Sequence, residues 1–166
     1  MITIAPERPE DRWEVEALYD LCFAPGRTAL SSYRLRDDVA PVRALSQVAR
    51  DDDGILAGAI RFWPVHVGQA DALLLGPVAA HPTRQGEGIG SSLIRDSLWK
   101  AEHSHWDRVL LVGDAPYYQR FGFARLSGVE MPPPTNPERI LGLSLCPGAW
   151  AGVQGKVRRW TGAAQR

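Results

Sequence analysis

The sequence predicts a fold of the α/β class, because strand-like and helix-like segments alternate along the chain. Two apolar segments, 45–49 and 55–65, flank a polar turn and are typical of a β-hairpin. A third apolar segment, 73–80, leads through a glycine-rich turn into residues whose apolar positions recur at helical spacing. A chain of 166 residues with 45% hydrophobic residues is also long enough to bury a core, so we expect residues 1–166 to form a single domain.

The N-terminal part is predicted to contain one strand and two helices. Ile2–Ile4 is a short strand, and Pro9 opens a helix. Pro25–Gly26 ends this helix, and a second, shorter helix is expected over residues 29–36. One face of the first helix is expected to be apolar and to consist of Trp13, Ala17, Leu18, Leu21 and Cys22.

The middle of the chain is predicted to hold the hairpin and a central strand. A turn is expected at Asp51–Gly54, because aspartates before a glycine favour turns. A metal site is the alternative, but consecutive aspartates lack the spaced ligands of a calcium loop. The next strand, 72–80, contains Gly76–Pro77, and proline cannot donate to a sheet ladder. We therefore expect a bulge or a loss of pairing there.

The C-terminal half is predicted to contain one long helix and two further strands. The helix starts at Ile89, and the strands cover 108–112 and 140–146. A single helical turn is expected over 116–121, and the proline-rich stretch 131–137 is expected to be a surface loop. The apolar face of the long helix consists of Ile89, Leu93, Ile94, Leu98 and Ala101.

The turn before the long helix is suited to an anion. Glycines at the alternate positions Gly86, Gly88 and Gly90 let the backbone pass close to a bulky group. The first helical turn then presents unpaired N–H groups at the positive end of the helix dipole. The third glycine comes one residue too early for a dinucleotide fingerprint, and no Gly-Lys-Ser/Thr follows as in a Walker loop. The simpler alternative is that these glycines only permit a tight turn.

The same residues carry a family resemblance. Gln85–Gly90 has the pattern Q-x-x-G-x-G and resembles the acetyl-CoA pyrophosphate loop of the GNAT N-acetyltransferase superfamily. The strand that ends in Val78–Pro82 resembles the fourth strand of that family, and Tyr118–Phe123 resembles its later Tyr-x-x-x-Gly-Phe element. The spacing between these elements agrees as well. The resemblance extends to one bacterial subfamily of N-acetyltransferases through residues 23–27, 33–36, 112–118 and 145–148, and so covers most of the chain.

The resemblance implies a mixed, mostly antiparallel sheet with splayed central strands, flanked by helices. It also implies an acetyl-CoA-dependent N-acetyltransferase that acts on a primary amine of a small molecule or a protein. The acetyl-pantetheine arm would lie where the fourth and fifth strands splay apart, and Gly76–Pro77 supplies a local reason for the splaying. The cofactor-binding residues carried over are Val78, Ala79, Ala80, Gln85, Gly86, Glu87, Gly88, Ile89, Gly90 and Ser91.

Tyr118 is the candidate catalytic residue. It stands four residues before Gly122, where the resemblance implies the tyrosine that protonates the coenzyme A thiolate, whereas Tyr117 does not match. A phenol with a pKa near ~10 stays protonated at neutral pH and can donate to a leaving group. The alternative is that the ring of Tyr118 only fills the wall of a groove.

The general base is left open. Many family members place a glutamate on the fourth strand or nearby, but residues 73–80 contain no carboxylate. Asp114, His66 and His81 are candidates, and water is another. We expect Asp114 to cap the helical turn that follows it, and His81 to make backbone contacts in a loop. His103 and His105 are expected to be structural residues at a helix C-terminus.

The sequence gives only a weak indication of the chemical class of the acceptor amine. In the family the first two helices line the acceptor side, so the resemblance implies that Phe23, Arg27, Tyr33 and Arg34 shape this pocket. The two arginines would suit an acceptor that bears a carboxylate or a phosphate.

Charge and composition exclude other classes of function. Nineteen basic and nineteen acidic residues give a net charge of zero, which provides no field to attract nucleic acid or an anionic membrane. The basic cluster 156–160 is expected to be a solvated strand or tail. Cys22 and Cys146 form no C-x-x-C motif and are expected to be small buried residues, without a metal site. Without a signal segment or a long apolar run, we expect a cytoplasmic monomer or homodimer.

Two rival functions belong to other classes. A non-catalytic acyl-CoA-binding sensor or interaction module would keep the glycine-rich loop without turnover; the missing carboxylate supports it and Tyr118 argues against it. A nucleotide-binding protein is disfavoured by the spacing of the glycines.

Overall fold

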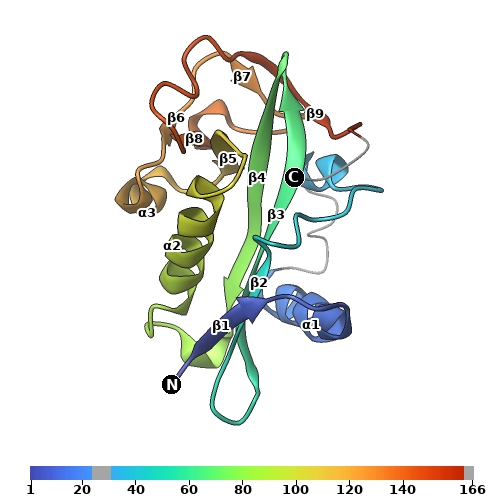
Figure 1. Ribbon diagram of the computed structural model, residues 1–166, viewed down its shortest axis with the longest axis vertical. Coiled ribbons are helices and arrows are strands. Elements are labelled where there is room, and N and C mark those ends of the chain that lie inside the picture. The colour runs from blue at the N-terminus through green and yellow to red at the C-terminus, as the bar shows by residue number, and fades with distance from the viewer. Residues whose placement is uncertain (24–30, 163–166) are drawn as a thin grey trace.

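A mixed sheet forms the frame of the protein. In the computed structural model, which describes residues 1–23 and 31–162, its strands lie in the order β1-β2-β3-β4-β5-β8-β6 (Figure 1). All neighbours in this order are antiparallel except β4 and β5, which are parallel, so the sheet is mixed and mostly antiparallel as predicted. The strands are β1 (Thr3–Pro6), β2 (Gln47–Arg50), β3 (Leu56–Val67), β4 (Ala70–Ala80), β5 (Arg108–Val112), β6 (Ala124–Arg125), β7 (Val129–Glu130), β8 (Ile140–Ser144) and β9 (Gly155–Arg159).

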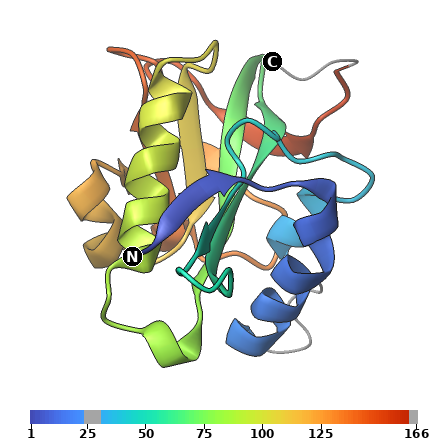
Figure 2. The ribbon, with the colours of Figure 1, turned by 60° about the horizontal axis from the view of Figure 1, so that its bottom comes forward.

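Helices cover both faces of this sheet. Figures 1 and 2 show α1 (Arg12–Cys22) and α2 (Ile89–Glu102) on opposite sides of β3 and β4. Leu93 and Ile94 of α2 pack with Ile60 on one face, and Leu18 of α1 packs with Ala59 on the other. A short helix, α3 (Ala115–Tyr118), follows β5, and 3-10 helices cover Pro9–Asp11, Ser31–Leu35, Pro82–Arg84, Gln119–Phe121 and Pro137–Arg139. None of the helices in the described part of the chain is long and apolar enough to span a membrane.

The central hairpin and its irregularity agree with the sequence. The turn between β2 and β3 closes through a hydrogen bond from the Asp51 N–H to the Ile55 carbonyl, at 3.0 Å. In the β3–β4 ladder Ile60 pairs with Val78 and Phe62 pairs with Leu75, so the register shifts at Gly76–Pro77. The bulge is therefore confirmed at the position where the chain lacks an N–H.

β4 and β5 splay apart beyond a short contact. They pair only at Leu73 with Val109 and at Leu74 with Leu110. From Leu75 to Ala80, β4 continues along β3 without a partner on its other edge among the described strands. This opening is the predicted splaying of the central strands.

Several local predictions are wrong. The predicted apolar face of α1 is right at Leu18, which is buried, and at Cys22, which packs beside it, but wrong at Ala17 and at Trp13 and Leu21, which are 80% and 59% exposed. The stripe that faces the sheet is shifted around the helix and contains Val15 and Tyr19 instead. Cys146 is exposed because β8 ends before it. The helix expected over 29–36 is a 3-10 helix over Ser31–Leu35, and residues 24–30, with Pro25–Gly26 and Arg27, lie outside the described residues.

Candidate active site

The glycine loop, which we define as residues 85–91, joins β4 to α2. Gly86 and Gly88 have φ angles of +86° and +76°, a conformation that side chains disfavour. A Cβ at either position would meet no atom within 4 Å, so these glycines are required by the backbone and the space beside them is open. The Ser92 N–H donates to the Gly88 carbonyl at 2.9 Å, so the amides of residues 89–91 precede the helical ladder. Such amides at a helix start are directed toward a bound anion.

A groove of about 580 Å³, here called the loop groove, runs along the glycine loop. Of the ten predicted cofactor-binding residues, all but Glu87 line it. Glu87 instead accepts two hydrogen bonds from Arg84 Nε, at 3.0 and 2.9 Å, and this interaction lowers the pKa of Glu87. Ile89 is 4% exposed and its side chain belongs to the core, so only its backbone can face a ligand. The remaining lining residues are Cys22, Phe23, Arg84, Tyr117, Tyr118 and Arg120.

Tyr117 and Arg120 are lining residues that the sequence reasoning missed. The Tyr117 hydroxyl lies 3.5 Å from Ser91 Oγ, which places it against the glycine loop. Arg120 lies over the Tyr117 ring at 4.7 Å, and no carboxylate in the described parts of the chain pairs with its guanidinium. The pair adds a hydroxyl and a positive charge to the groove. Their separation by three residues in a helical segment could have suggested a shared face.

A second cavity, of about 330 Å³, opens where β4 and β5 diverge, and we call it the strand-gap cavity. Its walls come from Phe23 just after α1, the 3-10 helix Ser31–Leu35 with Arg36 after it, β4, β5, the segment after β5 and Arg139. It shares three residues, Phe23, Val78 and Tyr118, with the loop groove. The two cavities therefore meet at Tyr118.

The Tyr118 side chain is half-buried among other rings. Its ring centroid lies 5.0 Å from that of Tyr117 and 5.9 Å from that of Phe123. Burial, with a smaller effect of Tyr117, raises the pKa of Tyr118 to about 12, so the hydroxyl stays protonated at neutral pH. No group among the described residues hydrogen-bonds this hydroxyl, which leaves its proton available to a ligand.

The three side chains proposed as general bases lie in different places relative to the two cavities. Asp114 caps α3 as expected, since its Oδ2 accepts a hydrogen bond from the Tyr117 N–H at 3.2 Å. Asp114 is also one of the residues that line the strand-gap cavity. His81 accepts a hydrogen bond from the Thr83 N–H at 3.2 Å, which confirms its local role. His66 is 3.1 Å from Asp71 and lines neither cavity. The structure thus leaves Asp114 as the one of these three that faces the strand gap.

The cavity where we expect the acceptor is lined by a different arginine from the predicted ones. Phe23 and Tyr33 line the strand-gap cavity, but Arg34 is exposed and lines neither cavity. Arg36 lies there instead, together with Arg139. A 3-10 helix repeats every three residues, so Arg36 shares the side of Tyr33 and Arg34 does not.

Comparison with known proteins identifies the family. A family model described as "Acetyltransferase (GNAT) domain" matches residues 44–125. The "Uncharacterized N-acetyltransferase YhbS" of Escherichia coli K12 is 31% identical over 122 residues, which cover 72% of this chain and 72% of that protein. The chain belongs to the GNAT acetyltransferases. This acetyltransferase also shares its fold with the crystal structure of YhbS from Escherichia coli in complex with CoA, at a TM-score of 0.82 and 27% identity, covering 96% of this chain and 89% of that one.

The acetyltransferase uses acetyl-CoA as its cosubstrate. A GNAT family acetyltransferase from Brucella melitensis, solved in complex with acetyl-CoA, matches with a TM-score of 0.74 and 30% identity over 97% of both chains. The residues present here fit such a ligand, because the open space beside Gly86 and Gly88 continues into the gap between β4 and β5.

Proposed function

We propose that the acetyltransferase transfers the acetyl group of acetyl-CoA to a primary amine of a small molecule or a protein, by direct attack of the amine on the thioester. In this proposal residues 1–166 act as one catalytic domain. The observation that carries the proposal is the meeting of the loop groove and the strand-gap cavity at Tyr118. An anion-binding loop and an unpaired strand edge thereby converge on a half-buried proton donor.

The binding roles follow from the backbone of β4 and of the glycine loop. β4 pairs with β3 through Val78, Ala79 and Ala80, so alternate backbone groups of these residues point toward the open edge. These groups would hold the acyl arm in the manner of an added strand. The amides of residues 86–91 would take the pyrophosphate, with Tyr117 and Arg120 beside them.

The chemical roles belong to the strand edge and to Tyr118. Acetyl-CoA supplies an acetyl group that is activated as a thioester. A backbone N–H of the β4 edge would donate to the carbonyl oxygen as negative charge develops there. Tyr118 would donate its proton to the sulfur as the carbon–sulfur bond breaks and the carbon–nitrogen bond forms. β4 offers no carboxylate between Leu73 and Ala80, so the amine proton would pass to Asp114 or to water at the mouth of the cavity.

A specific observation favours one second candidate function. The absence of a carboxylate from residues 73–80 would suit a protein that binds acyl-CoA as a sensor or interaction module without turnover. Such a protein would need the loop groove but would not need the Tyr118 hydroxyl.

The test is an acetylation screen with two readouts. The protein is incubated with acetyl-CoA and a panel of amines, amino acids and peptides, and both free thiol and acetylated product are measured. Binding is measured in parallel from the melting temperature, and CoA at about 100 times its dissociation constant should stabilise the protein by about 2.7 kcal/mol. We expect acetyl-CoA to stabilise, ATP and NAD to have no effect, and at least one amine to be acetylated. CoA binding without any product would favour the sensor, and stabilisation by ATP or NAD alone would overturn both functions.

A further inference from the structure

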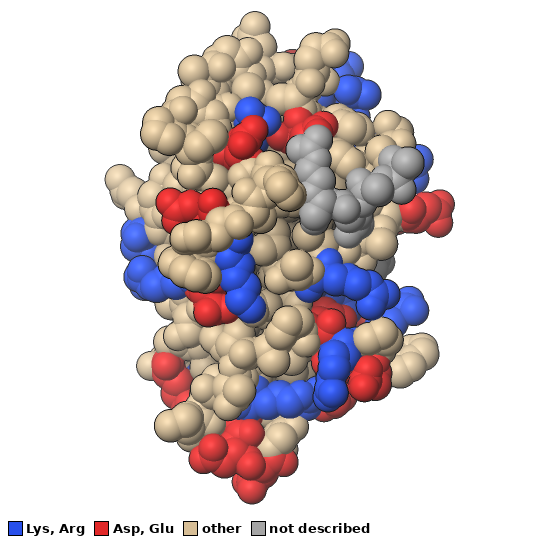
Figure 3. Space-filling model, viewed as in Figure 1, with Lys and Arg blue, Asp and Glu red and all other residues tan. Residues whose placement is uncertain are grey.

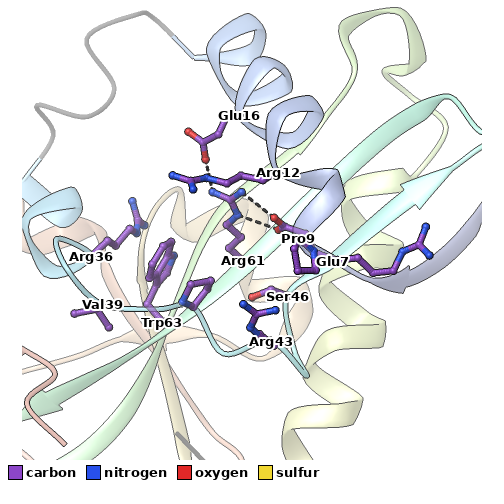
Figure 4. A pocket seen from close by; sticks show the side chains of 12 residues that line it. Glu7, Pro9, Arg12, Glu16, Arg36, Val39, Arg43, Ser46, Arg61 and Trp63 are labelled. Carbon is purple, nitrogen blue, oxygen red and sulfur yellow. Dashed lines mark hydrogen bonds and ion pairs between the residues drawn. The ribbon is translucent and has the colours of Figure 1, made fainter. Parts of the chain in front are cut away.

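A third cavity, of about 510 Å³, adjoins the strand-gap cavity on the α1 side of the sheet, and we call it the arginine cavity. It lies between the start of α1, the segment 36–46 and β3, as the close view in Figure 4 shows. Arg36 lines both this cavity and the strand-gap cavity. The two spaces therefore share one guanidinium, near the point where β4 leaves β5.

The position of Arg36 is defined by aromatic rings and by β4. Its guanidinium carbon lies 4.2 Å from the centre of the Tyr33 ring and 5.8 Å from that of Trp63. Trp63 is itself anchored, since its Nε1–H donates to the Gly76 carbonyl at 2.7 Å. A Cβ built on Gly76 would lie 3.4 Å from Arg36 Nη2. The positive charge is therefore held beside the stretch of β4 whose next residues line the strand gap.

The charged lining of these two cavities is mainly positive. Among the described residues it contains three carboxylates, from Glu7, Glu16 and Asp114, and six arginines: Arg8, Arg12, Arg36, Arg43, Arg61 and Arg139. On the face of the molecule that Figure 3 shows, basic and acidic side chains are interspersed.

The carboxylates of this lining are already engaged. Arg61 donates to Glu7 at 3.0 and 2.9 Å and to Glu16, as Figure 4 shows. Burial opposes the charge of Arg61, but the hydrogen bonds and charges of these partners outweigh burial and raise its pKa. Asp114 caps α3. Arg12 and Arg43, on different sides of the cavity in Figure 4, have no carboxylate within 4 Å in the described ranges 1–23 and 31–162.

Positive surroundings have two consequences for an amine. They disfavour the ammonium form, so they promote the neutral nucleophile that a site without a strand carboxylate needs. They also repel an acceptor that is cationic overall, such as a polyamine or a lysine-rich peptide. These surroundings therefore favour an acceptor that brings its own negative charge.

On this basis, and resting on the proposed function, we propose that the acceptor is an amine that also carries a carboxylate or a phosphate, and that Arg36 binds this anionic group. The guanidinium nitrogen on the Gly76 side, Nη2, can donate a charge-assisted hydrogen bond to either anion. With the anion at Arg36, the amine end of the acceptor extends into the strand-gap cavity toward Tyr118. Arg36 is thus a specificity-determining residue that touches the acceptor.

The test compares small amine acceptors that differ in charge. β-Alanine supplies the carboxylate and O-phosphoethanolamine the phosphate. Ethanolamine is the control that lacks an anionic group, and spermidine is the polycationic one. Each is tested with acetyl-CoA and a readout of thiol release. We expect at least one of the two anionic amines to exceed ethanolamine in kcat/KM by at least about tenfold, in the range of a charged hydrogen bond, and spermidine to be the poorest acceptor. The better anionic amine tells whether the group is a carboxylate or a phosphate.

Substitutions test whether the preference for anionic amines depends on Arg36. Arg36→Gln should raise KM for the anionic amine about 10- to 100-fold, leave kcat within a few-fold and leave the dissociation constant of CoA unchanged. Arg36→Lys should restore part of the loss. Arg34→Gln, on the 3-10 helix just before Arg36 and outside both cavities, is the matched control and should behave as the parent protein. Melting temperatures verify that each variant is folded.

The outcomes separate the two proposals. Equal or faster acetylation of ethanolamine or spermidine, or an unchanged KM in Arg36→Gln, would overturn the anionic acceptor while leaving the acetyltransferase activity intact. If no amine is acetylated, the proposed function fails, and calorimetry with inorganic phosphate and N-acetylglycine on the CoA-saturated protein judges the anion site. Binding that Arg36→Gln removes would support that site, and no binding of either probe would overturn it.

Discussion

The Tyr117 hydroxyl lies 3.5 Å from Ser91 Oγ, so α3 touches the first turn of α2 across the loop groove. Tyr117 lines the loop groove alone, whereas the adjacent Tyr118 also lines the strand-gap cavity. Two neighbouring phenols thus occupy different positions along one site. Substitutions at the two positions should therefore separate ligand binding from chemistry.

Removing the Tyr118 hydroxyl should slow turnover without weakening CoA binding. Tyr118→Phe keeps the ring and removes the proton donor, so we expect kcat to fall about 10²- to 10⁴-fold. Tyr117→Phe should keep kcat within a few-fold and weaken CoA binding by less than about tenfold, because it removes one contact with Ser91. Steady-state kinetics and calorimetry with CoA measure both effects. Equal, small losses in the two variants would make Tyr118 a packing residue.

Gly113 should be needed for the placement of the Tyr118 ring. A Cβ on Gly113 would lie 2.6 Å from Tyr118 Cε2 and 2.9 Å from Leu111 Cδ1, so Gly113→Ala must displace one of these side chains. We expect kcat to fall about 10- to 100-fold while the dissociation constant of CoA changes little. The control is a double-mutant cycle: in the Tyr118→Phe background the same substitution should cost little further. An additive loss in that background would show that Gly113 acts independently of Tyr118.

An acidic side chain at Gly88 should abolish CoA binding. Gly88→Asp strains a backbone at φ +76° and puts a negative charge where the amides would meet phosphate. Gly148→Asp is a matched control, because Gly148 has a φ of +73°, also has open space at its Cβ and lies outside the loop groove. We expect similar losses of melting temperature in both variants and a loss of CoA binding by calorimetry only in Gly88→Asp. Tight CoA binding in Gly88→Asp would mean that the glycine loop does not hold the pyrophosphate.

Asp11 should make the free energy of unfolding depend on pH in the acidic range. Its burial acts to raise the pKa, but the hydrogen bond from the Arg8 N–H and the pairing with Arg50 at 2.7 Å outweigh burial, so the pKa lies below its ordinary value. A depressed pKa stabilises the fold above the unfolded-state pKa, near ~3.9, and this contribution is lost as the pH falls through the folded-state pKa.

The Asp11 contribution can be measured by substitution. Asp11→Asn should therefore lower the free energy of unfolding by about 1–3 kcal/mol at pH 7, and by progressively less below about pH 4. Urea unfolding at a series of pH values measures this difference. Asp52→Asn, at an exposed turn position, should change it by less than about 1 kcal/mol. A constant difference for Asp11→Asn down to pH 2 would contradict the role of the charge.

Local conformation was the most predictable part of the fold. The aspartate turn, the irregularity at Gly76–Pro77 and the start of the long helix at Ile89 all follow from the conformational limits of a few consecutive residues. The buried face of α1 was not predictable in this way. Trp13 is exposed because the orientation of the helix is decided by the sheet that it covers, and not by its own periodicity alone.

The features of the candidate site also fall into those that depend on neighbours along the chain and those that depend on packing. By itself the sequence determined the glycine spacing, the free helix start and the position of Tyr118 before Gly122, because each depends on neighbours along the chain. The tertiary structure alone decided that Arg36, rather than Arg34, stands beside the strand gap. It also decided that Arg120 lines the loop groove and that several arginines line the arginine cavity. Arg36 reaches Gly76 across forty residues of sequence, and such a contact depends on how separate elements pack, which no local pattern encodes.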